Sequence, residues 1–316
     1  MQPLTADPTD PSPETGPAWD CLVVGAGPGG LTAATYLGRF RRRVLVADGG
    51  EPRASWIPVS HNLPGFPEGI RGRDILKRMR EQAEEYGAVI HPGRVEGLAR
   101  RPDHFSVGLG DQRVKARSVL LATGVLDHQP PLPGVEDAIR RSLVRICPIC
   151  DGYEATGKRV AILGKDDMGV REAAFLRTYT REITLIHVGP TEALTERRAL
   201  AEMGVDLVEV PVEAVRLEGD RASALCWGGE YRQFDYVYSA LGTSPNVELA
   251  QALGVPLSDD GRLVVDDHQQ IGLPGLYAVG DVVKGLNQIA VATAEAAVAA
   301  TAIHNALREA DGWTVD

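Results

Sequence analysis

The chain contains two thiols at a spacing that suits redox chemistry, in the sequence Cys147-Pro148-Ile149-Cys150-Asp151. Thiol–disulfide exchange needs one thiolate to attack and a second thiol nearby to resolve the mixed disulfide. A helix that begins at the first cysteine would lower the pKa of its thiol. Asp151 is a candidate proton carrier for the departing thiol, and a carboxylate that caps the helix is the alternative interpretation. Cys147, Cys150 and Asp151 are therefore the candidate catalytic residues.

Metal binding and structural disulfides are the other uses of such a cysteine pair. A structural zinc site needs a second pair of Cys or His ligands at short spacing, and the sequence contains no such pair. Because the chain begins without a secretory signal, we expect a cytoplasmic protein in which a CxxC is catalytic. The other cysteines, Cys21 and Cys226, are expected to be buried small hydrophobes. The sequence therefore predicts no metal site.

Composition and charge narrow the class of protein. The 316 residues are enough for two domains, and the net charge of -10 argues against nucleic acid as the main partner. The longest apolar stretch, residues 289–303, is interrupted by Glu295, so we expect no membrane span. Residues 1–18 are rich in Pro, Asp and Thr and are predicted to form a disordered tail.

A dinucleotide-binding pattern follows the first apolar strand. Residues 21–24 read as a buried parallel strand, and Gly25, Gly27 and Gly30 then satisfy GxGxxG ahead of an apolar helix. The glycines permit the tight turn, the approach of a pyrophosphate and close helix–strand packing, respectively. A second strand ends at Asp48, near the spacing expected for an acid that binds a ribose hydroxyl. A glycine-rich turn used only for packing is the alternative.

Two later segments are consistent with the same nucleotide fold. Residues 118–124 form an apolar strand that ends in a turn of small residues, and residues 275–281 form another that ends in Gly280-Asp281. A carboxylate there can bind the ribityl hydroxyls of a flavin. An alanine-rich helix is expected over residues 288–300, and its N-terminus could face the pyrimidine edge of the flavin.

The chain resembles the thioredoxin reductase family of low molecular weight from about Trp19 to Leu307. The matching segments are GAGPGG, HNLPGFP at residues 61–67, LLATG, CPICDG, ALGTSPN at residues 240–246 and YAVGD. The resemblance implies an α/β fold of two Rossmann-like, three-layer ββα nucleotide-binding domains, the second inserted in the first. The FAD-binding domain would span residues 19–124 and 246–316, the insert residues 125–245, and the protein would be a homodimer.

The resemblance also implies the roles of individual residues. Cys150 would lie against the flavin, Cys147 would attack the substrate disulfide, and Asp151 would act as general acid. The residues expected to bind FAD are Gly25, Gly27, Gly30, Asp48, Asn62, Val95, Ala122, Thr123, Gly124, Gly280, Asp281, Gln288, Ile289 and Ala290.

The second nucleotide-binding pattern is damaged. Residues 159–163 form a strand and Gly164 starts the turn, but Asp166 stands where the second glycine should be, and Asp167 follows it. A side chain there blocks the pyrophosphate and its charge repels it. Helix capping by these acids in an unused site is the alternative interpretation, and it too implies that NADPH is not used.

The clamp for the 2′-phosphate is also incomplete. NADPH-dependent relatives have HRRxxxR where this chain has His187-Val188-Gly189-Pro190, so the arginines that select a 2′-phosphate are missing. Arg197 and Arg198 come slightly later and are candidate substitutes.

Three functions remain open from the sequence. One is a flavin-linked disulfide reductase of a thioredoxin-like protein, supplied by ferredoxin or a second flavin; an ordinary NADPH-dependent thioredoxin reductase is its close variant. Another is an FAD-dependent dithiol oxidase that uses O2 on a small-molecule dithiol, and the last is a flavin-binding sensor without turnover. With Pro148, the motif reads Cys-Pro-x-Cys. In this it resembles two branches of the family, the dithiol oxidases and the reductases that do not use pyridine nucleotide. The basic cluster of Arg39, Arg41, Arg42 and Arg43 could receive ferredoxin or be a solvated helix end.

Overall fold

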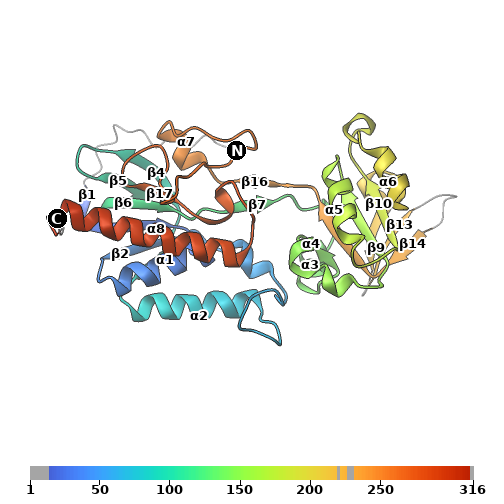
Figure 1. The fold of residues 1–316 in the computed structure, drawn as a ribbon, viewed down its shortest axis with the longest axis horizontal. Helices are drawn as coiled ribbons and strands as arrows, with labels where there is room; N and C mark the ends of the chain where they lie inside the picture. The colour runs from blue at the N-terminus through green and yellow to red at the C-terminus, as the bar shows by residue number, and fades with distance from the viewer. Residues whose placement is uncertain (1–13, 219–220, 226–230, 314–316) are drawn as a thin grey trace. The chain divides into compact units, whose positions relative to one another are not determined.

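The computed structural model describes residues 14–218, 221–225 and 231–313, and these divide into two compact units (Figure 1). The outer unit takes in the described residues up to Ser55, then Gly72–Leu126, and the described residues from Pro245 onward. The inserted unit takes in Trp56–Arg71 and Asp127–Ser244. Two of the places where the chain passes from one unit to the other lie in β7 (Val125–Asp127) and β16 (Thr243–Pro245), and these strands pair with each other.

A seven-stranded sheet forms the centre of the outer unit, in the order β3-β2-β1-β6-β5-β4 with β17 beside β6. Its strands are β1 (Glu14–Val24), β2 (Val44–Asp48), β3 (Val89–Pro92), β4 (Val95–Arg100), β5 (Phe105–Leu109), β6 (Gln112–Leu121) and β17 (Leu276–Ala278). Strand β6 is parallel to β1 and β17 but antiparallel to β5. It therefore belongs both to a parallel sheet and to the antiparallel layer β4-β5-β6. The sequence predicted the buried strand at residues 21–24 and the one that ends at Asp48.

Helices cover this sheet and bury its apolar residues. They are α1 (Pro28–Arg39), α2 (Gly72–Glu85), α7 (Glu248–Ala252) and α8 (Ile289–Ala310). Helix α1 packs against both α2 and α8 (Figure 1). Helix α8 is long and apolar enough to cross a membrane by length and composition alone. Its Ala292, Ala296 and Ile303 are buried, however, and Glu295 within it accepts a hydrogen bond from the Gly280 amide at 2.7 Å. These contacts pack one face of α8 against the outer unit, chiefly against α1.

The inserted unit has a parallel five-stranded sheet and a small antiparallel sheet. The larger sheet has the order β11-β10-β9-β15-β8, and the smaller one the order β12-β13-β14. The strands are β8 (Val144–Arg145), β9 (Val160–Gly164), β10 (Ile183–His187), β11 (Asp206–Glu209), β12 (Val215–Glu218), β13 (Arg221–Leu225), β14 (Tyr231–Phe234) and β15 (Tyr236–Ala240). The helices are α3 (Val135–Arg140), α4 (Pro148–Asp151), α5 (Met168–Leu176) and α6 (Arg197–Met203). The predicted α/β class with two Rossmann-like units is confirmed.

Two predicted boundaries differ from the structure. Residues 14–18 belong to β1, because Glu14 pairs with Arg113 of β6 and accepts hydrogen bonds from His104, so the predicted tail of residues 1–18 is wrong for this part. Residues 1–13 lie outside the described residues. Trp56–Arg71 belongs to the inserted unit, so the predicted continuous segment of residues 19–124 is also wrong there. Besides the crossings on either side of this segment, the chain crosses between units at residues 126/127 and 244/245, against the expected 124/125 and 245/246.

The prediction that Cys21 and Cys226 are buried can be compared with the structure for Cys21. Cys21 is fully buried in β1, and this burial raises the pKa of its thiol to about 12, so it is the small buried hydrophobe that the sequence predicted. Cys226 lies outside the described residues.

Candidate active site

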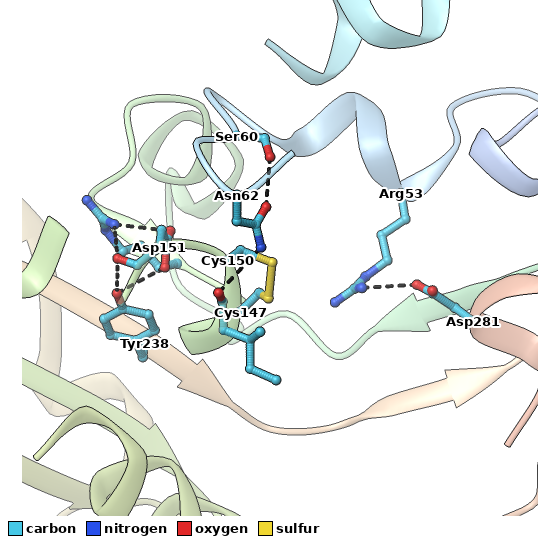
Figure 2. Close-up of a disulfide and its surroundings, with 10 residues drawn as sticks. Arg53, Ser60, Asn62, Cys147, Cys150, Asp151, Tyr238 and Asp281 are labelled. Carbon is cyan, nitrogen blue, oxygen red and sulfur yellow. Dashed lines mark hydrogen bonds and ion pairs between the residues drawn. A yellow bond between two sulfur atoms is a disulfide. The ribbon is translucent and has the colours of Figure 1, made fainter. Parts of the chain in front are cut away.

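The dithiol lies where β8 leads into the short helix α4. Cys147 caps this helix, Pro148 occupies its first turn, and the Cys150 amide donates to the Cys147 carbonyl at 3.0 Å. The Cys147 and Cys150 sulfurs form a disulfide, with their Cα atoms 5.3 Å apart (Figure 2). The predicted helix start at Cys147 is therefore confirmed. Proline suits this position because the first amides of a helix have no intrahelical acceptor.

Asn62 contacts the dithiol turn from a distant part of the sequence. Its Nδ2 donates to the main-chain oxygen of Ile149 at 3.4 Å, and Ser60 Oγ donates to its Oδ1 at 3.0 Å (Figure 2). The segment around Asn62 is closed by a pairing between Ser60 and Ile70. Asn62, which the sequence assigned to FAD, thus supports the turn between the two cysteines.

The carboxylate of Asp151 is held by two side chains of the inserted sheet. Arg145 Nη1 lies 3.1 Å from Asp151 Oδ2, and the Tyr238 hydroxyl donates to Asp151 Oδ1 at 3.0 Å (Figure 2). Burial raises the pKa of Asp151 to about 6, against the opposing effects of Arg145 and Tyr238. Near-neutral pH therefore changes the protonation of the residue next to Cys150.

Arg145 and Tyr238 are site residues that the sequence analysis missed. Both stand in short apolar segments that read as ordinary core strands. The available signal was a lone arginine in such a segment, directly before the cysteine pair, because a buried arginine is rare unless it is paired.

The glycines of the first motif differ in the space around them. A Cβ atom on Gly25, whose φ is +110°, would lie 2.3 Å from the Ala122 oxygen. One on Gly30 would lie 1.9 Å from the Gly25 oxygen, whereas one on Gly27 would meet nothing closer than Pro52 Cβ at 3.8 Å. Gly25 and Gly30 are thus required for the turn and the packing, and the backbone at Gly27 is open to a ligand.

The next predicted ligands follow β2 and β6. Asp48 ends β2, accepts a hydrogen bond from the Gly50 amide at 3.2 Å, and forms an ion pair with Arg80 of α2. Val95 begins β4 and packs against the core of the outer unit. Ala122, Thr123 and Gly124 follow β6 directly, and Thr123 exchanges hydrogen bonds with Asn246 at 2.7 and 2.8 Å.

The last predicted ligands lie between β17 and α8. Gly280 and Asp281 form a 3₁₀ turn, and Asp281 Oδ2 lies 3.0 Å from Nη1 of Arg53 (Figure 2). Gln288 caps α8, and Ile289 and Ala290 begin it. Arg53 and Arg80 are further residues that the sequence analysis missed, because each meets its acid only through the fold.

In the second glycine motif, the carboxylates of Asp166 and Asp167 bind backbone amides at the starts of two helices, α5 and α6. Asp166 Oδ1 accepts a hydrogen bond from the Met168 amide at 2.8 Å, at the first residue of α5. Asp167 Oδ1 accepts from the Thr195 and Glu196 amides at 2.8 and 3.0 Å, just before α6. A hydrogen bond from the Thr195 hydroxyl, together with those from the two amides, lowers the pKa of Asp167, since all of them favour its charged form. The capping interpretation thus holds for Asp166 on α5, while Asp167 serves the next helix.

The region expected to bind a 2′-phosphate is also filled by interactions of the chain itself. Arg197 forms two hydrogen bonds to Glu209, at 2.8 and 2.6 Å, and Arg198 pairs with Glu202 at 2.7 Å. His187 is 2% exposed. A Cβ atom on Gly189 would lie 2.1 Å from the Lys165 oxygen, so these two turns are in close contact.

Comparison with known proteins identifies the family. The family described as pyridine nucleotide-disulphide oxidoreductase matches residues 19–296. The chain belongs to this family. It is 30% identical over 296 residues to a thioredoxin reductase of Mycolicibacterium smegmatis, covering 89% of this chain and 94% of the relative.

Solved structures agree with this assignment. The thioredoxin reductase of Streptococcus pyogenes superimposes with a TM-score of 0.83 at 26% identity, covering 92% of this chain and 99% of that one. The protein HlmI superimposes with a TM-score of 0.84 at 28% identity, covering 95% and 96%. The expected resemblance to thioredoxin reductases is confirmed, and this member of the family is a flavin-dependent disulfide oxidoreductase.

The first glycine motif of this family member fits FAD. Its tight positions, Gly25 and Gly30, are filled by the chain, and its open position, Gly27, is the one at which a pyrophosphate approaches. The start of α1 after Gly27 adds positive potential and a helix N-terminus at which phosphates can bind. A flavin bound there supplies a two-electron redox centre. The chain's own candidates for disulfide exchange are Cys147 and Cys150, and Asp151 is its candidate for proton transfer.

Proposed function

We propose that the chain is an FAD-dependent thiol–disulfide oxidoreductase whose flavin does not receive electrons from NADPH. The observation that carries this proposal is the carboxylate of Asp166 on the first amide of α5. The start of this helix is where a pyrophosphate would bind in a working site. An anion of the chain takes its place there, and at about 4 Å a second anion would be repelled by about 4 kcal/mol at an effective dielectric near 20.

The pairing of Arg197 with Glu209 supports the same conclusion. A guanidinium that already forms two hydrogen bonds to a carboxylate must give up those bonds before it can bind a 2′-phosphate. Arg198 forms one exposed hydrogen bond, to Glu202. Arg197 is therefore no ready substitute for the missing phosphate clamp, and Arg198 alone does not replace its several arginines.

The donor we propose is ferredoxin or a second flavin, and the target a thioredoxin-like protein or a small-molecule dithiol. By analogy with its relatives we propose a homodimer in the cytoplasm. The basic cluster adds no support for ferredoxin. Arg39 lies over the Tyr86 ring, Arg42 pairs with Asp311, and Arg43 lies over the Trp19 ring.

A dithiol oxidase that passes electrons to O2 is the second candidate. The dithiol substrate would reduce the Cys147–Cys150 disulfide, and the electrons would then pass through the flavin to O2. Because this path needs no NADPH, a nucleotide site blocked by Asp166 is equally consistent with it. Hydrogen peroxide formed during dithiol turnover in air would favour the oxidase.

An anaerobic titration tests the proposed electron path. We expect millimolar NADPH to leave the flavin oxidised for minutes, whereas dithiothreitol bleaches it or produces a long-wavelength thiolate–flavin band. Bleaching by micromolar NADPH within seconds contradicts the proposal. Asp166→Gly is the matched variant, because it removes the anion and opens the turn, and we expect NADPH to reduce it at least about tenfold faster than the parent.

A further inference from the structure

Arg145 and Tyr238 stand side by side in the inserted sheet. They are register partners in the parallel strands β8 and β15. Each of them makes two contacts to Asp151, the last residue of α4. Arg145 Nη1 and the Tyr238 hydroxyl both donate to the Asp151 main-chain oxygen at 3.0 Å, in addition to their contacts with its carboxylate. Asp151 is therefore fixed at its backbone and at its side chain by the same pair of residues.

The guanidinium of Arg145 is itself held rigidly. Its Nε donates to the Ser142 oxygen at 3.3 Å, and its Cζ lies 3.8 Å from the centre of the Tyr236 ring. Its side chain is 6% exposed, and Tyr238 is fully buried. Solvent therefore screens this cation weakly, and its effect on Asp151 is correspondingly strong.

We propose that Arg145 and Tyr238 are positioning residues that hold Asp151 for proton transfer during thiol–disulfide exchange. The inference rests on the proposed use of Cys147 and Cys150 as the redox dithiol, but not on the identity of the electron donor. Three groups act on Asp151: Arg145 from β8, Tyr238 from β15, and Glu154, whose negative charge opposes them.

The proton accounting gives Asp151 two opposite tasks. In the first step the Cys147 thiolate bonds to one sulfur of the substrate disulfide, and the S–S bond breaks. The departing thiolate then takes the proton of Asp151 and leaves as a thiol. In the second step the carboxylate of Asp151 accepts the proton of the Cys150 thiol, whose sulfur bonds to Cys147 and displaces the second substrate sulfur as a thiolate. The dithiol is oxidised, the substrate disulfide is reduced, and Asp151 ends in its starting state.

The two side chains suit a group that must give and then regain a proton. An acid is most effective when its pKa lies near the working pH. Burial pushes the pKa of Asp151 upward, and the fixed cation and hydroxyl limit the rise to about 6. Without them the carboxyl would hold its proton too firmly for the second step.

A comparison of two disulfides isolates this proton transfer. Reduced, flavin-loaded full-length protein is mixed anaerobically with 2-hydroxyethyl disulfide or with dithionitrobenzoate between pH 5 and 9. The aliphatic leaving thiol needs a proton, whereas the weakly basic aromatic thiolate departs without one. The rate with 2-hydroxyethyl disulfide is divided by the rate with dithionitrobenzoate, because both rates depend on the ionisation of Cys147 and the ratio cancels it. We expect this ratio to fall as the pH rises through about 6, the pKa of Asp151.

The variants then assign the positioning role. In Arg145→Met the midpoint of that fall should move up by at least about one pH unit, because a neighbouring guanidinium lowers a carboxyl pKa by about 1–3 units. Arg145→Lys should restore it, Tyr238→Phe should move it up by less, and Asp151→Asn should abolish it. Tyr238→Phe keeps the ring and tests the inference even if Arg145→Met does not fold.

The outcomes that overturn the inference differ from those that overturn the function. If Tyr238→Phe and the Arg145 variants exchange disulfides with an unchanged midpoint, the pair is only structural. If the parent shows no fall in the ratio, Asp151 carries no proton in this step. If reduced protein exchanges equally well after Cys147→Ser, the dithiol assignment itself is wrong.

Discussion

Cys150→Ser should abolish the long-wavelength thiolate–flavin band of the reduced protein, and Cys147→Ser should preserve it. The reason is that only one of the two sulfurs, the one assigned to Cys150, is expected to lie against the flavin. Both variants should lose turnover with an external disulfide by at least about 10³-fold, since removal of a covalent nucleophile has effects of this size or larger. Absorbance spectra after anaerobic reduction and steady-state disulfide assays measure the two effects.

A third variant provides the control. Cys21→Ala removes a free cysteine that is fully buried in β1 and far in sequence from the dithiol. It should leave the thiolate–flavin band and the rate of disulfide exchange unchanged. The opposite spectral pattern, with the band lost in Cys147→Ser and kept in Cys150→Ser, would mean that the two sulfurs have exchanged roles.

Gly30→Ala should destabilise the outer unit and yield a colourless protein. The new methyl group would lie 1.9 Å from the Gly25 oxygen, so the strand and helix must separate. Overpacking of this kind costs about 1–3 kcal/mol in the free energy of unfolding, and about 2–4 °C in melting temperature follows for each kcal/mol. Thermal unfolding of the flavin-free protein measures this loss separately from cofactor binding.

Gly27→Ala is the matched substitution in the same motif. Its methyl group would meet nothing within 3.8 Å, so the flavin-free protein should unfold at the parent's temperature. It should nevertheless bind FAD more weakly, because the methyl group enters the space through which a pyrophosphate reaches the backbone. Equal unfolding temperatures for the flavin-free Gly30→Ala and Gly27→Ala proteins would show that this distinction between the two glycines is wrong.

Local patterns in the sequence predicted much of this molecule. The strand predicted at residues 159–163 is β9, the glycine turn precedes α1, and the cysteine pair begins α4. These elements follow from an apolar run or from turn chemistry, which are properties of neighbouring residues. The capping of α5 by Asp166 was also within reach, because a cap acts over two or three residues.

Contacts between distant segments could not be predicted in this way. Arg53 and Asp281 are 228 residues apart, and Tyr238 lies 87 residues beyond Asp151. The strand at Glu14 was missed for the same reason. Burial alone would raise the pKa of Glu14, but the neighbouring polar groups, which include His104 and Lys115, lower it to about 2. Those partners are known only once β5 and β6 are in place.

The position of β17 has a consequence for the order in which the protein can fold. This strand pairs with β6, although more than 150 residues separate them, and α8 then packs on α1. The strands of the inserted sheet, in contrast, all lie between Val144 and Ala240. A ribosome therefore releases everything that the inserted sheet needs while the outer sheet still lacks β17. Since domains generally fold as units during synthesis, we expect the inserted unit to fold before the N-terminal and C-terminal parts of the outer unit assemble.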